Sequence, residues 1–429
     1  MKRLWLVALI PCLLRAEVHE LTLKQAIDLA LHQNPEVIMA RLDEEKAQYG
    51  VRLAKDPFIP KVYTGSGAAY TYGYPNTIDG AAPSIIQMRT DMAIYNRSKS
   101  YALAEARETS RGAGFDAQAK TEDIVYRTAT LFLDAEQAAR NVELARQERE
   151  SYERVRAVVA SRVSEGRELE LAGRRADVDL ARSRQREGVL NSDQAYSEGS
   201  LAMVLGYPPG DRVRAIADDD SLAAMLSKAE PENEDAAVTG AMSSSRTIRS
   251  LQSQVAAKSL EVRSQRAMRL PTINLVAQYS LFAKSTYQAY FGKFQRNNAQ
   301  LGFDIEMPLL VGSASSALAA QAEADVEKLR QQVKLERDRV SLEARRVYAQ
   351  MKDLRDARNL AKLDLEVSRE QLSVLLAQMD EGRATSQQVD LARVEEEEKW
   401  MTYYSAERDL ETARLQMLKQ SGGLLAALK

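Results

Sequence analysis

Hydrophobic residues recur at steps of three, four and seven in two long tracts of the chain. The positions are Leu131, Ala135, Ala138, Val142, Ala145, Tyr152, Val155, Val159 and Val163 in the first tract, and Ala322, Val326, Leu329, Val333, Val340, Val347, Leu354 and Ala361 in the second. This heptad spacing is typical of helices that pack as coiled coils. Proline is absent from 84 to 207 and after 308. Because an interior proline costs a helix about 3 kcal/mol, both tracts can form very long helices.

A glycine-centred break interrupts each tract. The breaks read Glu165-Gly166-Arg167 and Glu381-Gly382-Arg383, and glycine readily ends a helix in the left-handed conformation. Each tract is therefore predicted to be a helical hairpin, with Gly166 and Arg167, or Gly382 and Arg383, at its tip. The helix over about 314–378 would be roughly 95 Å long at 1.5 Å per residue. We also expect Gly112 and Gly114 to loosen the first hairpin near its start.

Four other segments alternate apolar and polar residues, as strands do. They cover 62–74, 85–95, 272–282 and 300–309. Apolar-out, polar-in alternation over about ten residues is typical of outer-membrane barrel strands, although the edge of a soluble β-sandwich alternates too. The polar faces carry four charged residues that we interpret as candidates for a barrel lumen, where they would tune conductance or simply keep the lumen wet: Arg89, Asp91, Asp304 and Glu306.

The chain contains an internal duplication. Val51-Arg52 and Pro60 match Val262-Arg263 and Pro271, while Gly166 and Ala176 match Gly382 and Ala392. The predicted organisation is a first repeat at 17–206 (helix, two strands at about 58–96, hairpin tip near 166), an acidic equatorial linker at 207–240, a second repeat at 241–421 (helix, two strands at about 270–309, hairpin tip near 382) and a C-terminal tail at 422–429.

Four strands are too few to close a barrel, for which about eight are the practical minimum. Two chains would give a barrel filled by its own side chains, whereas three would give twelve strands with a water-filled lumen. Three chains would also supply twelve helical segments. The predicted fold is therefore mainly α with membrane β: duplicated long helical hairpins form an α-barrel, and four strands per chain form a trimeric 12-stranded β-barrel.

Residues 1–16 have the pattern of a secretory signal. Lys2 and Arg3 precede an apolar run that ends at Leu14, and Ala16 is a plausible last residue before cleavage. The alternatives are a buried N-terminal helix and a lipoprotein cleaved before Cys12, although the Pro11 that precedes Cys12 disfavours the lipoprotein.

Composition excludes several other classes of protein. Charged residues make up 28% of the chain and the net charge is -2, which disfavours a nucleic-acid surface. Cys12 is the single cysteine and lies in the leader, and the two histidines are His19 and His32. We therefore expect no His/Cys metal or haem site and no cofactor. Without a nucleophile–base pair or a phosphate loop, we expect no enzyme.

Several short segments, in this order along the chain, resemble one family. They are Leu21-Thr22-Leu23-Lys24-Gln25-Ala26-Ile27-Asp28-Leu29-Ala30-Leu31 with Asn34-Pro35-Glu36, then Arg269-Leu270-Pro271 before a strand, then Met307-Pro308-Leu309-Leu310-Val311-Gly312 before the second long helix. With the duplication and the two glycine tips, they make the chain similar to the TolC family of outer-membrane factors over essentially its whole length after the leader.

This resemblance implies a homotrimer in outer-membrane lipid, with most of the chain in the periplasm. It implies a passive exit duct of a tripartite efflux or type I secretion system, which works with a periplasmic adaptor and an inner-membrane pump. Cargo would be drugs, metals, polysaccharide or secreted polypeptide. The hairpin tips would form the periplasmic entrance and open by an iris-like movement.

In that family, acidic residues on the second hairpin narrow the entrance. The matching positions here are Gln388 and Leu391, so an aspartate ring is not expected at those positions. Asp380, Glu381 and Asp390 are nearby substitutes that would favour cations in a narrow mouth, or they are solvated turn residues.

Two further clusters on the second hairpin have open interpretations. The run Glu395 to Glu398 is either a solvated helix face or a face that docks an adaptor or attracts cations. The aromatic residues Trp400, Tyr403 and Tyr404 either pack against other helices or stack on substrate.

Two other functional classes also compete. A structural periplasmic coiled-coil or adaptor-like protein fits the heptads and the leader, but it leaves the four symmetric strands unexplained. An enzyme acting on peptidoglycan would need a catalytic constellation that the sequence does not contain.

Overall fold

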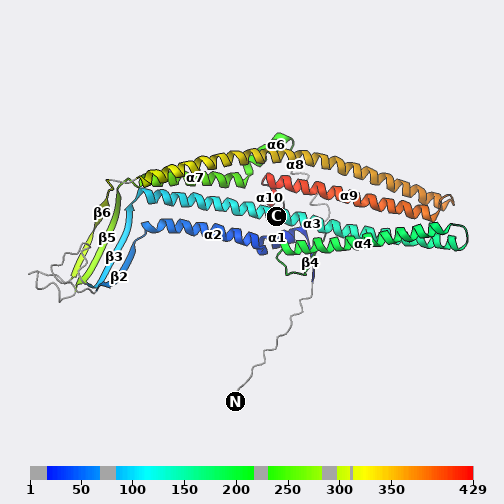
Figure 1. Ribbon diagram of the computed structural model, residues 1–429, viewed down its shortest axis with the longest axis horizontal. Coiled ribbons are helices and arrows are strands. Elements are labelled where there is room, and N and C mark those ends of the chain that lie inside the picture. Colours follow the sequence, from blue (N-terminus) through cyan, green and yellow to red (C-terminus); the bar gives the residue numbers. More distant parts are fainter. Residues whose placement is uncertain (1–16, 68–83, 217–229, 283–296, 310–312, 429) are drawn as a thin grey trace, which may run out of the picture. The chain divides into compact units, whose positions relative to one another are not determined.

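The computed structural model describes residues 17–67, 84–216, 230–282, 297–309 and 313–428 (Figure 1). The expected leader and part of the segment 62–74 lie outside these residues. The chain divides into two compact units. We call Arg41–Ala117 with Arg246–Glu336 the strand unit, and Met1–Ala40, Gln118–Ser245 and Arg337–Lys429 the hairpin unit. The helices α2 (Pro35–Lys55), α3 (Arg97–Ser164) and α8 (Ala314–Asp380) each contribute residues to both units.

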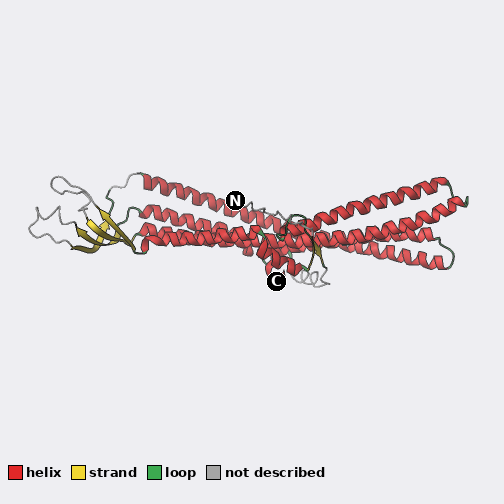
Figure 2. Cartoon of the chain, turned by 90° about the horizontal axis from the view of Figure 1, so that it is seen from below, coloured by secondary structure: helices red, strands yellow, loops and turns green. Residues whose placement is uncertain are grey.

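The strand unit contains one four-stranded antiparallel sheet (Figure 2). Its strands are β2 (Lys61–Gly67), β3 (Ser84–Tyr95), β5 (Thr272–Phe282) and β6 (Asn297–Glu306), in the order β2-β3-β5-β6. The short helix η1 (Asp56–Phe58) leads from α2 into β2. Within the described residues, β2 and β6 each have a neighbouring strand on one side only, so each leaves a row of backbone donors and acceptors without a strand partner.

The helices of the strand unit pack through small side chains. Val262 on α7 (Arg246–Ala267) meets Ala322 and Val326 on α8 in a buried cluster. A Cβ added to Gly112 of α3 would lie 3.5 Å from the Cβ of Ser253. Gly112 therefore lies where α3 contacts α7, and the contact leaves room for a Cβ at ordinary van der Waals distance. The prediction that Gly112 and Gly114 loosen the hairpin is wrong, because α3 runs through both without a break.

The hairpin unit contains the two predicted hairpins. The first joins α3 to α4 (Glu170–Val204), and the second joins α8 to α9 (Ser386–Gln420). In the first hairpin, Val155 and Val159 pack against Ala176. In the second, Met351 packs against Leu410 and Ala413. These apolar contacts between the helices of each hairpin agree with the predicted coiled-coil packing, and the mainly helical fold with a four-stranded sheet is confirmed.

The bases of the hairpins share the main hydrophobic core of the unit. Helix α1 (Leu23–Gln33) contributes Ile27, and α10 (Leu424–Leu428) contributes Leu424, which is fully buried. The segment expected as a C-terminal tail thus holds a helix that packs in the core. The other elements of this region are β1 (Val18–Leu21), β4 (Arg212–Ala215) and α6 (Glu234–Ser244).

Strands β1 and β4 pair in parallel, from Val18 opposite Arg212 to Leu21 opposite Ala215. The sequence did not predict this pair, because each strand has only four residues and the partners lie far apart in the chain. The segment expected as a linker therefore contributes a strand to this small sheet, and α6 begins within it.

Both hairpin tips use the same left-handed glycine turn. Gly166 has a φ of 71° and Gly382 a φ of 74°. At each tip the glycine N–H and the following arginine N–H bond to carbonyls of the last helical turn: Arg167 N lies 2.8 Å from Arg162 O, and Arg383 N lies 2.7 Å from Gln378 O. This is the Schellman arrangement, which satisfies carbonyls that the helix end would leave free.

Replacing a glycine by alanine should lower stability at the hairpin tips and raise it inside a helix. Gly166→Ala or Gly382→Ala should destabilise the protein by about 1 kcal/mol each, because a left-handed alanine is strained. Gly188→Ala is the matched control: Gly188 is an exposed residue inside α4 with nothing within 4 Å of an added Cβ. It should stabilise the helix by about 0.5–1 kcal/mol. Thermal unfolding followed by circular dichroism would give the unfolding midpoint of each variant. Equal changes in the midpoint for all three variants would contradict the turn assignment.

Candidate functional site

The two hairpin tips present the same pair of opposite charges. Glu165 and Arg167 lie 3.2 Å apart at the first tip, and Glu381 and Arg383 lie 3.1 Å apart at the second. All four side chains are largely solvated. Each tip therefore carries a local ion pair rather than an unpaired acid, and Glu381 is balanced by its neighbour.

Gln388 forms part of the helix cap at the second tip. Its side-chain oxygen accepts a hydrogen bond from Thr385 N at 2.8 Å, and Gln388 N donates to Thr385 Oγ1 at 3.3 Å. This reciprocal capping box starts α9. The first tip differs, because the side chain of Leu169 provides no such cap to α4. Asp380, at the end of α8, is exposed.

Asp390 is buried and joins the two hairpins. Only 5% of its surface is exposed, and Oδ1 accepts a hydrogen bond from Arg154 Nε of α3 at 3.3 Å. Arg154 also donates to Ser151 at 2.8 Å. Of the predicted entrance residues, Asp390 thus lies inside the contact between hairpins, whereas Asp380 and Glu381 lie on the surface near the tip.

Asp390 is the first of four polar residues that follow one heptad face of α9 toward α3. We call them the polar seam: Asp390, Glu397, Tyr404 and Glu411. The guanidinium of Arg140 lies over the ring of Tyr404, 4.9 Å from the ring centroid, in a cation–π contact. Beyond Tyr404, Arg408 donates to Gln137 at 2.8 Å, and Lys419 pairs with Asp123 at 2.6 Å. Polar contacts therefore join α3 and α9 along most of α9.

Glu397 is a buried carboxyl group that lacks a cationic partner at hydrogen-bond distance in the part of the chain that the structure describes. It is 4% exposed, and its Oε2 atom has no hydrogen-bond partner there. Burial, followed by repulsion from Glu148 of α3, raises the pKa of Glu397 to about 8, although Arg393 and Arg154 oppose the shift. Glu397 is therefore mostly protonated at neutral pH.

The pKa values of two more carboxyl groups, Glu411 of the seam and Glu148 of α3, are also raised. Burial, and then the neighbouring Glu407 and Glu136, raise the pKa of Glu411 to about 7. Burial also raises the pKa of Glu148, against the attraction of Arg186. Arg186 of α4 lies 3.4 Å from Glu148 and 3.2 Å from Glu398, so it forms a second link between the hairpins.

The run Glu395 to Glu398 is thus not a uniform solvated face. Glu395 and Glu398 are exposed, but Glu397 is buried, so that interpretation is wrong for Glu397. The aromatic residues beside the run pack together: Trp400 stacks on Tyr404 at 5.2 Å between centroids and meets Tyr403 edge-on at 6.1 Å. Arg358 and Arg369 lie over the Tyr403 and Trp400 rings, which agrees with the packing interpretation.

In the strand unit, the four predicted lumen residues share one face of the sheet. Asp304 lies opposite Asn274, which lies opposite Ala93. Arg89, Asp91 and Ala93 follow one another at steps of two along β3, and Glu306 follows Asp304 by two along β6. Side chains two residues apart in a strand point to the same side of the sheet, so all four charged residues share one face. Arg89 donates to Asp91 at 2.7 Å, which neutralises that pair locally.

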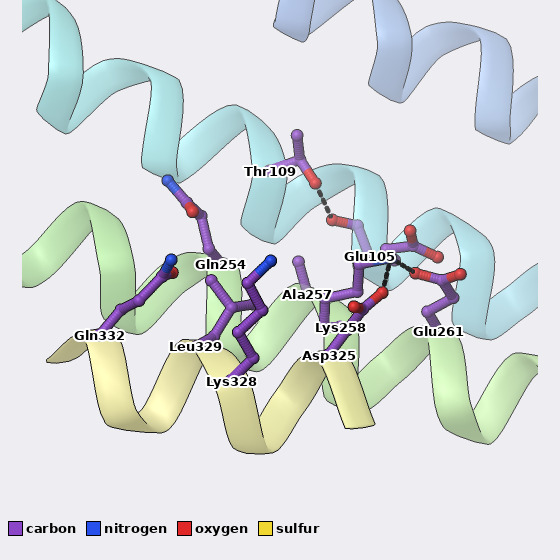
Figure 3. Close-up of a pocket in the computed structure, with 10 residues that line it drawn as sticks. All are labelled: Glu105, Thr109, Gln254, Ala257, Lys258, Glu261, Asp325, Lys328, Leu329 and Gln332. Carbon is purple, nitrogen blue, oxygen red and sulfur yellow. Dashed lines mark hydrogen bonds and ion pairs between the residues drawn. The ribbon is translucent and has the colours of Figure 1, made fainter. Parts of the chain in front are cut away.

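A groove between helices of the strand unit was not predicted from the sequence (Figure 3). Its volume is about 380 Å³, and residues from α3, α7 and α8 line it. Lys258 lies between two acids, 2.6 Å from Glu261 and 3.4 Å from Asp325. Burial, and then repulsion from Glu261, raise the pKa of Glu105 on the opposite wall. The groove is therefore a mixed-charge surface in which the acids Glu105, Glu261 and Asp325 outnumber the lysines Lys258 and Lys328.

Two searches of the described residues gave negative results. No group of three or more His, Cys, Asp or Glu side chains there could hold a metal ion. No helix in the same part of the chain is both long and apolar enough to cross a membrane.

Comparison with known proteins gives consistent matches. A sequence profile of the outer membrane efflux protein family matches residues 26–207 and 238–427. Protein CyaE of Bordetella pertussis is 26% identical over 360 residues, which are 79% of this chain and 70% of that protein.

Solved structures share the fold. The outer membrane protein VceC of Vibrio cholerae superposes with a TM-score of 0.71 at 15% identity, covering 94% of this chain and 96% of VceC. The CmeC outer membrane channel of Campylobacter jejuni gives a TM-score of 0.70 at 13% identity, covering 94% and 86%.

Glu397 predicts a pH-dependent stability. Because folding raises its pKa to about 8, its protonated form stabilises the fold fully below about pH 4.3, and this contribution is lost as pH rises through about 8. Glu397→Gln keeps the shape without the charge. At pH 9 we expect the free energy of unfolding of this variant to exceed that of the wild type by about 1–3 kcal/mol. At pH 5 the difference should be smaller.

Glu395→Gln is the control for this measurement, because Glu395 is exposed two residues away on the same helix. Thermal unfolding of the three proteins at pH 5, 7 and 9 would provide the comparison. If both variants changed with pH in parallel, the burial of Glu397 would not be the cause.

Proposed function

The chain belongs to the outer membrane efflux protein family, and from that premise we propose that it is the exit duct of a tripartite efflux or type I secretion machine. The protein is an outer-membrane channel whose long helices lie in the periplasm. Its family and its fold are those of channels, not of enzymes. In the proposed role it passes cargo outward from an inner-membrane pump, and it supplies no energy itself.

The exposed faces of the sheet are the observation that carries this proposal. On β6, the apolar Leu301, Phe303 and Ile305 are 79%, 68% and 67% exposed, and they alternate with Asp304 and Glu306 on the opposite face. A sheet with one exposed apolar face and one face that carries charged side chains suits lipid on one side and water on the other. A soluble coiled-coil or adaptor protein would gain nothing from this arrangement.

The open edges of the sheet support a homotrimer. Strands β2 and β6 run in opposite directions, so β6 of one copy can pair antiparallel with β2 of the next. Three copies would give twelve strands and satisfy every edge, which lipid requires. The exterior would be lipid, and Arg89, Asp91, Asp304 and Glu306 would line the water-filled interior.

The hairpin tips are the proposed periplasmic entrance, where a periplasmic adaptor would dock and connect the duct to its pump. Contacts between hairpins, rather than a ring of acids at the mouth, would hold this entrance closed. Asp390 with Arg154 and Glu398 with Arg186 both connect the first hairpin to α9. An iris-like opening would separate these pairs, and each separated charge would then be solvated by water.

Single-channel recording in planar bilayers tests both the channel and its gate. The wild type should fractionate with the outer membrane and form ion-conducting trimers, whereas recovery only from the soluble periplasm would contradict the duct. Asp390→Asn should open the entrance more often, because it weakens the link to Arg154. A link worth about 1.4 kcal/mol would shift the open–closed equilibrium tenfold.

Asp380→Asn is the matched control, because it removes the same charge from an exposed position near the same tip. If the hairpin link matters, only Asp390→Asn should change the open probability. If both variants raise conductance and weaken cation preference equally, a ring of acids at the mouth is the better explanation.

A further inference from the structure

Asp211 is a largely buried carboxylate that faces the first described residue of the chain. Its side chain is 14% exposed. Oδ1 accepts a hydrogen bond from the backbone nitrogen of Glu17 at 3.1 Å, and Oδ2 lies 3.5 Å from His19 Nε2. Both carboxylate oxygens therefore point at the start of β1.

The contacts around Asp211 hold Glu17 firmly in place. Arg212 N donates to Glu17 O at 2.9 Å, which continues the β1–β4 ladder by one residue. His19 stacks on Tyr207 with 4.3 Å between ring centroids and 17° between planes. The backbone nitrogen of Glu17 is thus fixed at hydrogen-bond distance from an acid.

Asp211 has no fixed positive charge as a partner in the described part of the chain. Its neighbours there are the Glu17 amide and His19, while Arg214 on the same sheet lies near Glu198 at 3.8 Å and Glu20 at 4.0 Å. A mostly buried carboxylate is costly without a cation. An amide N–H is a neutral donor, whereas an ammonium group at the same place would supply both charge and three hydrogens.

We propose that the chain is processed between Ala16 and Glu17, and that Asp211 binds the new N-terminal ammonium group. A leader-removing peptidase catalyses hydrolysis of the Ala16–Glu17 peptide bond by water. Ala16 leaves as a carboxylate, and Glu17 keeps the nitrogen, which takes up protons to become an ammonium. The amide hydrogen bond of the unprocessed chain becomes an ion pair. Removal of the leader thereby strengthens the attachment of β1 to β4.

Two independent observations support processing before Glu17. The leader pattern places Ala16 at a plausible cleavage site, and the structure places an acid without a fixed cationic partner at the nitrogen that this cleavage would charge. Such processing does not depend on the channel function, and it assigns Asp211 a role in anchoring the mature N-terminus.

The first test is the N-terminus of the full-length protein purified from membranes. Sequencing and intact mass should show a chain that starts at Glu17. A start at a lipid-modified Cys12, or at any residue other than Glu17, would overturn the proposal.

The second test isolates the charge in a double-mutant cycle. One chain starts at Glu17, and the other carries Gly-Ser-Gly before Glu17, which keeps the N–H donor but removes the ammonium from it. Each is made with and without Asp211→Asn. In the chain that starts at Glu17, Asp211→Asn should lower the unfolding midpoint of the assembled protein by about 2–4 °C. In the extended chain the loss should be clearly smaller.

Two controls keep this result interpretable. Asp235→Asn removes an acid whose side chain is 90% exposed, and it should shift both chains equally. Raising the pH to 10 neutralises the ammonium, whose ordinary pKa is about 8, and should remove the difference between the chains. If Asp211→Asn lowers the midpoint equally in both chains at pH 7, Asp211 acts only through neutral hydrogen bonds and the proposal fails.

Discussion

The contact between α3 and α9 is the interaction on which the hairpin unit depends. Each hairpin can form by itself from its own heptads, because its two helices are joined by a short glycine turn. Nothing in that local pairing connects the first hairpin to the second. The connection comes from α9, which meets α3 along a face that carries Asp390, Glu397, Tyr404 and Glu411. The two halves of the duplicated chain are thus joined by polar contacts along this face, in addition to the hydrophobic core that the hairpin bases share.

Carboxyl groups along this seam have different partners. Asp390 has Arg154 within hydrogen-bond distance, so its negative charge is compensated. Glu397, seven residues later on the same face, has Glu148 as a near neighbour and takes up a proton instead. Burial costs a charge far more than it costs a neutral acid. Glu397, which has no cation at hydrogen-bond distance in the described part of the chain, is therefore mostly neutral at pH 7.

The sequence predicted those parts of the fold that repeat over many residues. Heptads located α3 and α8, and the proline-free tracts with their breaks at Gly166 and Gly382 located both turns and the return helices α4 and α9. Alternation located β3, β5 and β6 within a few residues. It did not predict β1 and β4, since four-residue strands far apart in the chain leave no periodic signal. Gly112 was misread because its neighbour Ser253 lies on another helix.

In the candidate site too, features with a periodic sequence signal were predicted, whereas features that depend on a distant partner were not. The charged residues on the sheet face follow from alternation along a strand, and the structure places them together. The burial of Asp390 and Glu397 does not follow from charge, which by itself favours exposure. One signal was present, since the seam residues recur every seven positions. However, a polar heptad is read as a solvated face unless the partner helix is known, and Arg154, Arg140 and Glu148 lie on a helix from the other repeat.

A polar seam also suits an entrance that has to open. Separating an apolar helix contact exposes hydrophobic surface to water, at about 25 cal/mol for each Å². Separating Asp390 from Arg154 instead exchanges a partly desolvated pair for two hydrated groups, and the net cost of such an exchange is small. Within each hairpin, apolar contacts are accompanied by ion pairs such as Arg156–Asp177 and Arg358–Glu407, whereas the polar seam joins α3 to α9 beyond the apolar core that the hairpin bases share. The seam contacts are therefore the ones that a pump or adaptor could break without unfolding the helices.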